Sequence, residues 1–137
     1  MDTLLLGHGD PRVTLQNFAP PDSGDPYAGG SFEVVLEGDG LSARRSVFIF
    51  AHSDIGLFFA ELAEQWRGWL GSKLWESPDH DLVIEAKFRA GGHVEMTFAA
   101  QDGPLPTWRA EVTVEVEGGE EMSKAAAALA RLLGPDP

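Results

Sequence analysis

The sequence of 137 residues contains no cysteine, one tyrosine and only ten lysines and arginines. Without thiols the chain has no disulfide, no thiolate metal ligand and no cysteine nucleophile. The folded state must therefore be stabilised by packing. Because 43% of the residues are hydrophobic, a chain of this length can bury a sizeable core. We expect a single domain over residues 1–137.

Long hydrophobic runs are also missing. The first seven residues lack a basic start and contain only three consecutive leucines, Leu4 to Leu6. Such a run is too short for a signal-peptide core or a membrane span. We therefore expect a cytoplasmic protein with no membrane partner.

Basic residues are outnumbered by 22 aspartates and glutamates, which gives a formal net charge of −12. A field of this sign repels phosphate backbones and anionic lipid surfaces, so we expect no nucleic-acid partner. Two interpretations of the acidity remain open. It can serve solubility alone, or it can attract a basic protein partner.

Residues 19 to 30 are rich in proline, glycine and aspartate, which predicts a surface loop. Before this loop, Val13 and Leu15 alternate with polar residues and indicate a strand, with Leu4 to Leu6 as a further candidate. After it, two alternating segments flank Gly38-Asp39-Gly40. A two-residue Gly38-Asp39 turn would pair Leu36 with Leu41.

A period of three to four residues begins after His52 and predicts an amphipathic helix from Ser53-Asp54 to Gly71. The apolar stripe would pack on a sheet and place Trp66 and Trp69 in the core. Its members are Ile55, Phe58, Phe59, Leu62, Ala63, Trp66, Trp69 and Leu70.

Three further segments, near 82–88, 94–100 and 108–116, carry their apolar residues at even positions. This parity predicts a three-residue turn at Ala90-Gly91-Gly92 that pairs Phe88 with Val94. A second amphipathic stripe predicts a helix over Glu120 to Leu133, stopped by Gly134-Pro135.

These elements predict an α+β fold, with one antiparallel sheet of about five to seven strands, a central amphipathic helix and a C-terminal helix. The sequence shows no internal repeat and leaves the strand order open. Trp75 lies outside the helical stripe and could be on an edge strand, in the core or exposed. We favour the core.

No catalytic or cofactor motif is visible. Asp79-His80-Asp81, with His52 and His93, has residue types that bind metals, but its spacing matches no metal motif and Ser77-Pro78-Asp79 is better explained as a turn. His8 lies between glycines, yet no strand-to-helix context follows that would form a phosphate loop. We expect a non-enzymatic protein with no metal and no cofactor.

The order of elements over residues 31 to 133 resembles a family of small, uncharacterised bacterial domains that is itself similar to WapI-type immunity proteins. The resemblance is carried by Phe32-Glu33-Val34, Val47-Phe48-Ile49, the helix Leu57 to Trp69, Trp75-Glu76-Ser77, Gly92-His93-Val94, Trp108 and the closing alanine- and leucine-rich helix.

The resemblance implies a cytoplasmic antitoxin that binds and inhibits a basic, toxin-like protein. Its contacts would be exposed acids, for which we select Glu76, Asp79, Asp81, Glu95, Glu111 and Glu115. Two other classes remain open: a structural domain that self-associates into a homo-oligomer, and a small-molecule binding protein or enzyme.

Overall fold

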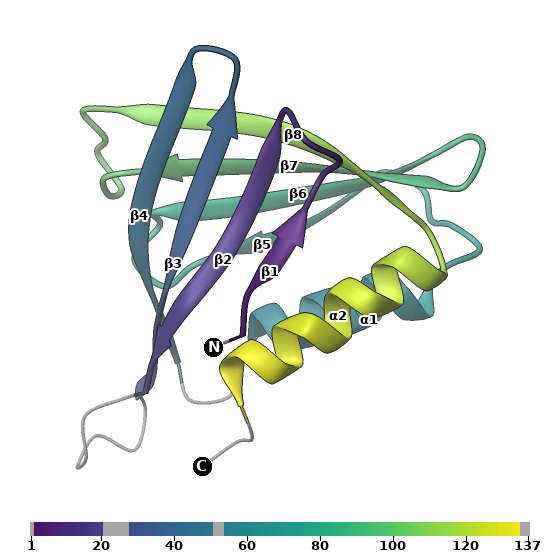
Figure 1. Cartoon of the computed structure of the whole chain (residues 1–137), viewed down its shortest axis with the longest axis horizontal. Helices are drawn as coiled ribbons and strands as arrows, with labels where there is room; N and C mark the ends of the chain where they lie inside the picture. The colour runs from purple at the N-terminus through teal and green to yellow at the C-terminus, as the bar shows by residue number, and fades with distance from the viewer. Residues whose placement is uncertain (1, 21–27, 51–53, 135–137) are drawn as a thin grey trace.

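The computed structural model describes residues 2–20, 28–50 and 54–134. In this part of the chain, eight strands form two four-stranded antiparallel sheets, and one helix follows each sheet in the sequence. The first sheet has the order β1-β2-β3-β4 and the second β5-β6-β7-β8. The α+β prediction is confirmed, but the single sheet is wrong. The strands divide into two sheets that cross each other steeply (Figure 1).

The elements of the first sheet are β1 (Leu4–Leu6), β2 (Arg12–Ala19), β3 (Ala28–Gly38) and β4 (Leu41–Phe50), followed by α1 (Asp54–Glu64). Those of the second are β5 (Ser72–Glu76), β6 (Leu82–Arg89), β7 (His93–Gln101) and β8 (Arg109–Glu117), followed by α2 (Glu120–Leu133). Four strands and a helix therefore occur twice in the same order. The architecture has a repeat where the sequence shows none.

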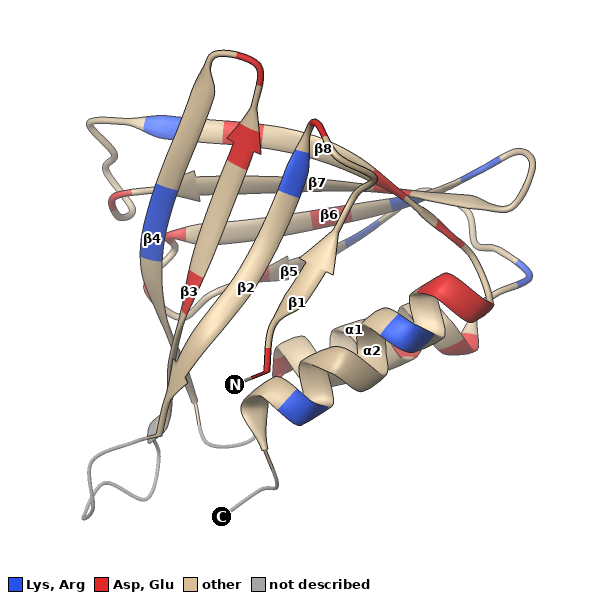
Figure 2. Cartoon of the chain, in the orientation of Figure 1, with Lys and Arg blue, Asp and Glu red and all other residues tan. Residues whose placement is uncertain are grey.

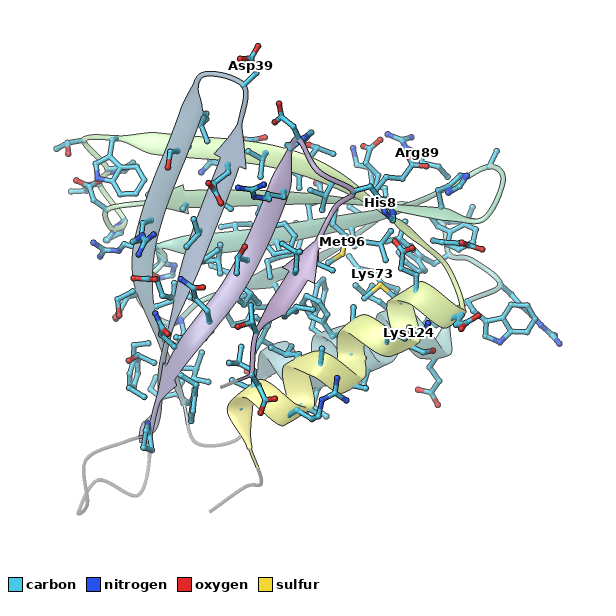
Figure 3. The ribbon with its side chains drawn as sticks, viewed as in Figure 1. His8, Asp39, Lys73, Arg89, Met96 and Lys124 are labelled. Atoms are coloured by element: carbon cyan, nitrogen blue, oxygen red, sulfur yellow. The ribbon has the colours of Figure 1, made fainter. Side chains whose placement is uncertain are left out.

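The core lies between the two sheets because the alternating apolar residues of every strand face inward. In the second sheet, directly opposite residues form continuous rows, such as Ile84, Phe98 and Val112 across β6, β7 and β8. Met96, on the neighbouring row, is fully buried between the sheets (Figure 3). Burial of such rows is the main stabilising contribution to the fold.

The two helices lie side by side and cover one end of the core (Figure 1). Helix α1 buries Ile55, Phe58, Phe59 and Leu62. It ends at Glu64, earlier than predicted, and Gly68 follows with a positive φ of 111°. Trp66 is therefore off the helical stripe and 55% exposed, so its predicted core position is wrong.

Trp69 is partly buried and packs against the core, where its ring meets Phe88 edge-on at 5.3 Å between centroids. Its indole N–H donates to the carbonyl of Ala86. Trp75 is 8% exposed on β5, which confirms the favoured core position and also places it on an edge strand.

Two hairpin registers can be compared with those predicted from the alternation of apolar residues. Phe88 pairs with Val94 across the turn Ala90 to Gly92, as predicted. The β3–β4 turn is two residues long, but it consists of Asp39 and Gly40, so Leu36 pairs with Ala43 rather than with Leu41. Gly40 has a φ of 75°, which the glycine at this turn position adopts without strain.

The predicted loop over 19 to 30 is shorter than expected, because β2 extends to Ala19 and β3 begins at Ala28. Residues 21–27 of that prediction lie outside the described part. The C-terminal helix has the predicted bounds, Glu120–Leu133.

One of the ion pairs that join the two halves of the chain involves a buried carboxylate. Arg45 lies on the inner side of β4, directly opposite the buried Val34, and its Nε donates to Asp81 Oδ2 at 3.1 Å. Asp81 is 2% exposed and precedes β6. Its other oxygen accepts from the Ser77 hydroxyl at 2.6 Å. This cluster satisfies a buried carboxylate where the sheets meet.

We predict that Arg45→Ala lowers the free energy of unfolding by about 2 kcal/mol, because it leaves the buried Asp81 carboxylate without its cation. Urea unfolding measures the change. The neighbouring Arg44→Ala is the control: Arg44 pairs with Glu33 on the exposed face and should cost less than about 1 kcal/mol. Equal losses in the two variants would contradict a structural role for the Arg45–Asp81 pair.

Candidate functional site

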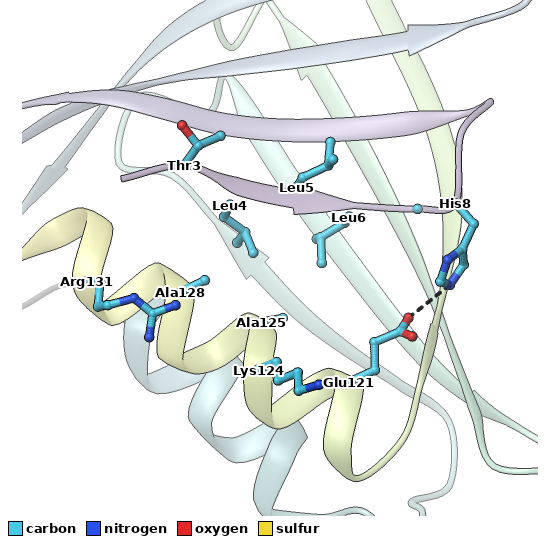
Figure 4. Close-up of a pocket in the computed structure, with 11 residues that line it drawn as sticks. Thr3, Leu4, Leu5, Leu6, His8, Glu121, Lys124, Ala125, Ala128 and Arg131 are labelled. Carbon is cyan, nitrogen blue, oxygen red and sulfur yellow. Dashed lines mark ion pairs between the residues drawn. The ribbon is translucent and has the colours of Figure 1, made fainter. Parts of the chain in front are cut away.

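A groove runs between strand β1 and helix α2 (Figure 4). Its volume is about 460 Å³. We call it the β1–α2 groove. Its residues are Thr3, Leu4, Leu5, Leu6, Gly7 and His8 on one side and Glu121, Lys124, Ala125, Ala128 and Arg131 on the other.

The strand side of the groove is a backbone edge. Successive side chains of a strand point to opposite faces, so a groove that contacts six consecutive residues must follow the backbone itself. Strand β1 is at the end of its sheet and, among the strands of the described residues, pairs with β2 alone, with Leu4 opposite Leu15 and Leu6 opposite Val13. Its other edge presents N–H and C=O groups toward the groove.

Packing fixes the position of this edge. Leu4 and Leu6 are buried and point toward α2, whereas Leu5 is 59% exposed on the opposite face of the sheet (Figure 4). The apolar contacts of two leucines thus hold β1 beside the helix. The edge of β1 that does not pair with β2 therefore lies along the groove.

The helix side is a single stripe, because residues 121, 124, 125, 128 and 131 are spaced three to four positions apart along α2. Ala125 and Ala128 form its middle. Both side chains are small: Ala125 is buried in the core and Ala128 is partly buried against it, beside β1. The charged residues of the stripe are Glu121 and Lys124 in its N-terminal half and Arg131 at its C-terminal end.

The two ends of the groove differ in charge. At one end, His8 Nε2 lies 3.2 Å from Glu121 Oε1, which also accepts from the backbone N–H of Glu117 at 3.2 Å. Lys124 pairs with Glu120 on the exposed helix surface at 3.2 Å. At the other end, Arg131 forms no ion pair with any carboxylate in the described part of the chain. Arg131 is therefore the charged lining residue at this end, which also carries Asp2 directly before Thr3.

The second candidate surface is the face of the β5–β8 sheet that points away from the core. It carries Glu95, Glu111 and Glu115 of the predicted contact residues, with Glu95 directly opposite Glu115. Each of the three has a partner: Arg89 for Glu95 at 3.2 Å, Arg109 for Glu111 at 3.4 Å, and His93 for Glu115 at 3.0 Å. Acidic and basic residues are therefore mixed on this face, and Figure 2 shows both kinds along these strands.

The other three predicted contact residues differ in their exposure to solvent. Glu76, at the end of β5, shares the outer face and pairs with His80 at 3.1 Å. Asp79 is exposed in the following turn. Asp81 is buried against Arg45 and Ser77, so its expected exposure is wrong. A short turn bonded to the Ser77 hydroxyl draws it inward, since the backbone N–H of Asp81 also donates to that oxygen.

The metal-ligand candidates are not brought together. His80 pairs with Glu76 and His93 with Glu115, while His52 lies outside the described residues. Within residues 2–20, 28–50 and 54–134, no three histidine, aspartate or glutamate side chains are placed to hold a metal ion. The same part of the chain contains no helix long and apolar enough to cross a membrane.

Two perturbed groups lie outside the groove. The side-chain hydrogen bond and charge of Glu37 raise the pKa of Arg12. The hydroxyl of Thr107 donates to Asp102 and lowers its pKa, aided by the backbone N–H groups of Thr107 and Trp108. Both shifts follow from local hydrogen bonds on the surface.

None of the groove residues was predicted from the sequence as a contact residue. His8 alone was considered, as part of a phosphate loop. The signals present were a short apolar strand at Leu4 to Leu6 and a helical stripe with central alanines. Neither signal shows that β1 and α2 are neighbours, because they lie at opposite ends of the chain.

A model of a family of unknown function, DUF6228, matches residues 6–136. The chain belongs to this family. The family resemblance to immunity proteins is not part of that match. No curated protein matches the sequence.

Among solved structures, the chain is similar to one titled as the plant transcriptional regulator PBF-2. The identity is 10%, the TM-score is 0.51, and the match covers 96% of this chain and 79% of the plant chain. At this identity the likeness concerns the fold alone.

We predict that Asp102 titrates below the ordinary pKa of an aspartate, because the Thr107 hydroxyl stabilises the ionised form. Carboxyl chemical shifts followed through a pH titration measure it. Thr107→Val removes the hydroxyl and should move the pKa back upward. A lowered folded pKa contributes stability that is lost as the pH falls through it, so Thr107→Val should also weaken the pH dependence there. An unchanged pKa in the variant would contradict this assignment.

Proposed function

We propose that the chain is a non-enzymatic protein-binding domain that holds an extended segment of a partner protein in the β1–α2 groove. The observation that carries the proposal is a free strand edge facing a helix stripe with small central residues. Extended peptides are commonly bound by pairing with such an edge, where main-chain hydrogen bonds give affinity and side-chain pockets give specificity.

The chemistry of the groove favours a peptide over a compact small molecule. Its strand side offers backbone N–H and C=O groups of alternate residues, which the backbone of another strand can match. A small ligand would leave most of these groups unused. The groove also continues from Thr3 to His8, a length that suits an extended segment.

The charge of the chain favours a protein over a nucleic acid. A net charge of −12 opposes approach of a phosphate backbone. The plant protein is titled a transcriptional regulator, but a likeness of fold does not supply a surface for DNA. We therefore propose no nucleic-acid partner for this chain.

An immunity-type role is the second candidate, in which a basic toxin-like partner contacts the outer face of the β5–β8 sheet. The observation that favours it is an excess of carboxylates over basic groups on the outer face of the sheet, which follows from the strand registers, while the two helices lie at the end of the core (Figure 1). Because nearby basic residues already pair with Glu95, Glu111 and Glu115, the attraction is weaker than the total charge suggests. The two surfaces can be tested separately.

We predict that Ala128→Phe abolishes partner binding, because the ring fills the middle of the groove. Tagged wild-type and variant chains are expressed in the cells that naturally make the protein, and co-purified proteins are identified and titrated by calorimetry. The matched control is Ala127→Phe, since Ala127 is exposed on the same helix and does not line the groove.

Both variants add the same ring, so a difference between them reports on the groove. Wild type and Ala127→Phe should retain the partner, and Ala128→Phe should lose it while keeping the thermal unfolding midpoint of the control. A partner that binds all three chains equally would contradict the groove. Recovery of no partner by the wild type would contradict the protein-binding role.

The second candidate predicts that the double variant Glu111→Lys and Glu115→Lys weakens binding of a basic partner about 10-fold or more, and that salt removes the difference. Affinity at low and high ionic strength measures this. The control is Asp39→Lys with Glu64→Lys, which makes the same change of charge at a hairpin tip and a helix end. Equal loss in both doubles would show a general charge effect and contradict a contact at the outer face.

A further inference from the structure

We infer that the segment held in the β1–α2 groove runs antiparallel to β1 and places a carboxylate of its C-terminal part against Arg131. The inference rests on the proposed function and adds the direction and chemistry of the bound segment. It follows from the relative direction of the two groove walls and from the distribution of their charges.

The two walls run in opposite directions. Leu4, at the start of β1, lies by Ala128 and Arg131, whereas Leu6 lies by Ala125 and Glu121 (Figure 4). A strand antiparallel to β1 therefore runs in the same direction as α2. Its N-terminal part lies near His8 and Glu121, and its C-terminal part lies near Arg131.

Antiparallel addition continues the existing sheet. All three pairings within β1 to β4 are antiparallel, so a fifth strand in the same sense extends the same hydrogen-bond pattern. Side chains of the added strand would then alternate between the alanine stripe of α2 and the exposed face beside Leu5. Small or β-branched residues suit the first position and apolar residues the second.

Among the described residues, neither Asp2, which directly precedes Thr3, nor any other carboxylate forms an ion pair with Arg131 at its end of the groove. Glu121 is already engaged by His8 and by the Glu117 N–H, and Lys124 has Glu120 as its partner. Arg131 is exposed and has no carboxylate among the described residues. A guanidinium forms its strongest contact with a carboxylate, which it can bind with two parallel hydrogen bonds.

The net charge of the chain does not prevent this contact. At physiological ionic strength, charges more than about 8 Å apart are largely screened in water. Acidic residues on the outer faces of the sheets are therefore weak contributors at the groove. Arg131 lines the groove directly and sets the local preference at its own end.

A displayed random heptapeptide library with free carboxyl ends tests the inference. It is selected in parallel on the wild-type chain and on the Arg131→Glu, Ala130→Glu and Ala128→Phe variants. Ala130→Glu is the control for added negative charge, because Ala130 is exposed at the same helix end but does not line the groove.

We expect the wild type and Ala130→Glu to enrich peptides with β-branched residues followed by aspartate, glutamate or an essential free carboxyl end. A synthetic peptide of the enriched sequence should bind Arg131→Glu about 10-fold more weakly, the change expected for losing one charge-assisted contact. Selection on Arg131→Glu should lose the acidic preference and enrich lysine and arginine at the same end.

Three outcomes overturn the inference, and they are distinguishable. Enriched peptides that keep the same acidic pattern on Arg131→Glu, or that show no charge preference, contradict the role of Arg131 and leave the proposed function intact. Peptides that bind Ala128→Phe as well as wild type contradict the groove itself. Failure to enrich any peptide above the Ala128→Phe background contradicts both the inference and the proposed function.

Discussion

The packing of two apolar sheet faces against each other is the interaction on which the rest of the structure depends. Each four-stranded meander has one apolar face and cannot be stable alone in water, so the first half of the chain must cover the second. The helix that follows each meander then closes the same end of the core. The Arg45–Asp81 pair compensates the one carboxylate that we find buried between the halves in the described part of the chain.

This arrangement also creates the candidate site. Strand β1 is only three residues long, and its buried leucines draw α2 against it. The helix lies beside β1, and the alanines of its stripe line the groove between them (Figure 4). The unpaired edge of β1 therefore lies beside the alanines of α2. The same core packing that stabilises the fold therefore leaves one strand edge open for another chain.

Much of the fold could be predicted from the sequence because its strands alternate cleanly. The register at Phe88 and Val94 followed from parity and a glycine turn, and the bounds of α2 followed from its stripe and Gly134. The predicted β3–β4 register was wrong because the turn was assigned to Gly38-Asp39 instead of Asp39-Gly40. Both dipeptides are consistent with a two-residue turn between the alternating segments. The division into two sheets could not be predicted, because alternation identifies an inner face but not what covers it.

The candidate site was less predictable for the same reason. The exposure of Glu111 and Glu115 followed from strand alternation, whereas Asp81 turned inward because its turn bonds to the Ser77 hydroxyl. The groove brings residues 3–8 beside residues 121–131, and no local pattern indicates a contact over that separation. Only the folded arrangement shows that Arg131 lies at the end of a free strand edge.

The central claim, that the outer edge of β1 is open in the free chain, is tested most directly by amide hydrogen exchange at Thr3 to Gly7. The account predicts that amides pointing into the groove exchange orders of magnitude faster than those bonded to β2, and that this difference persists at low protein concentration. Strong protection of every amide in this segment would contradict the account, because the edge would already be satisfied.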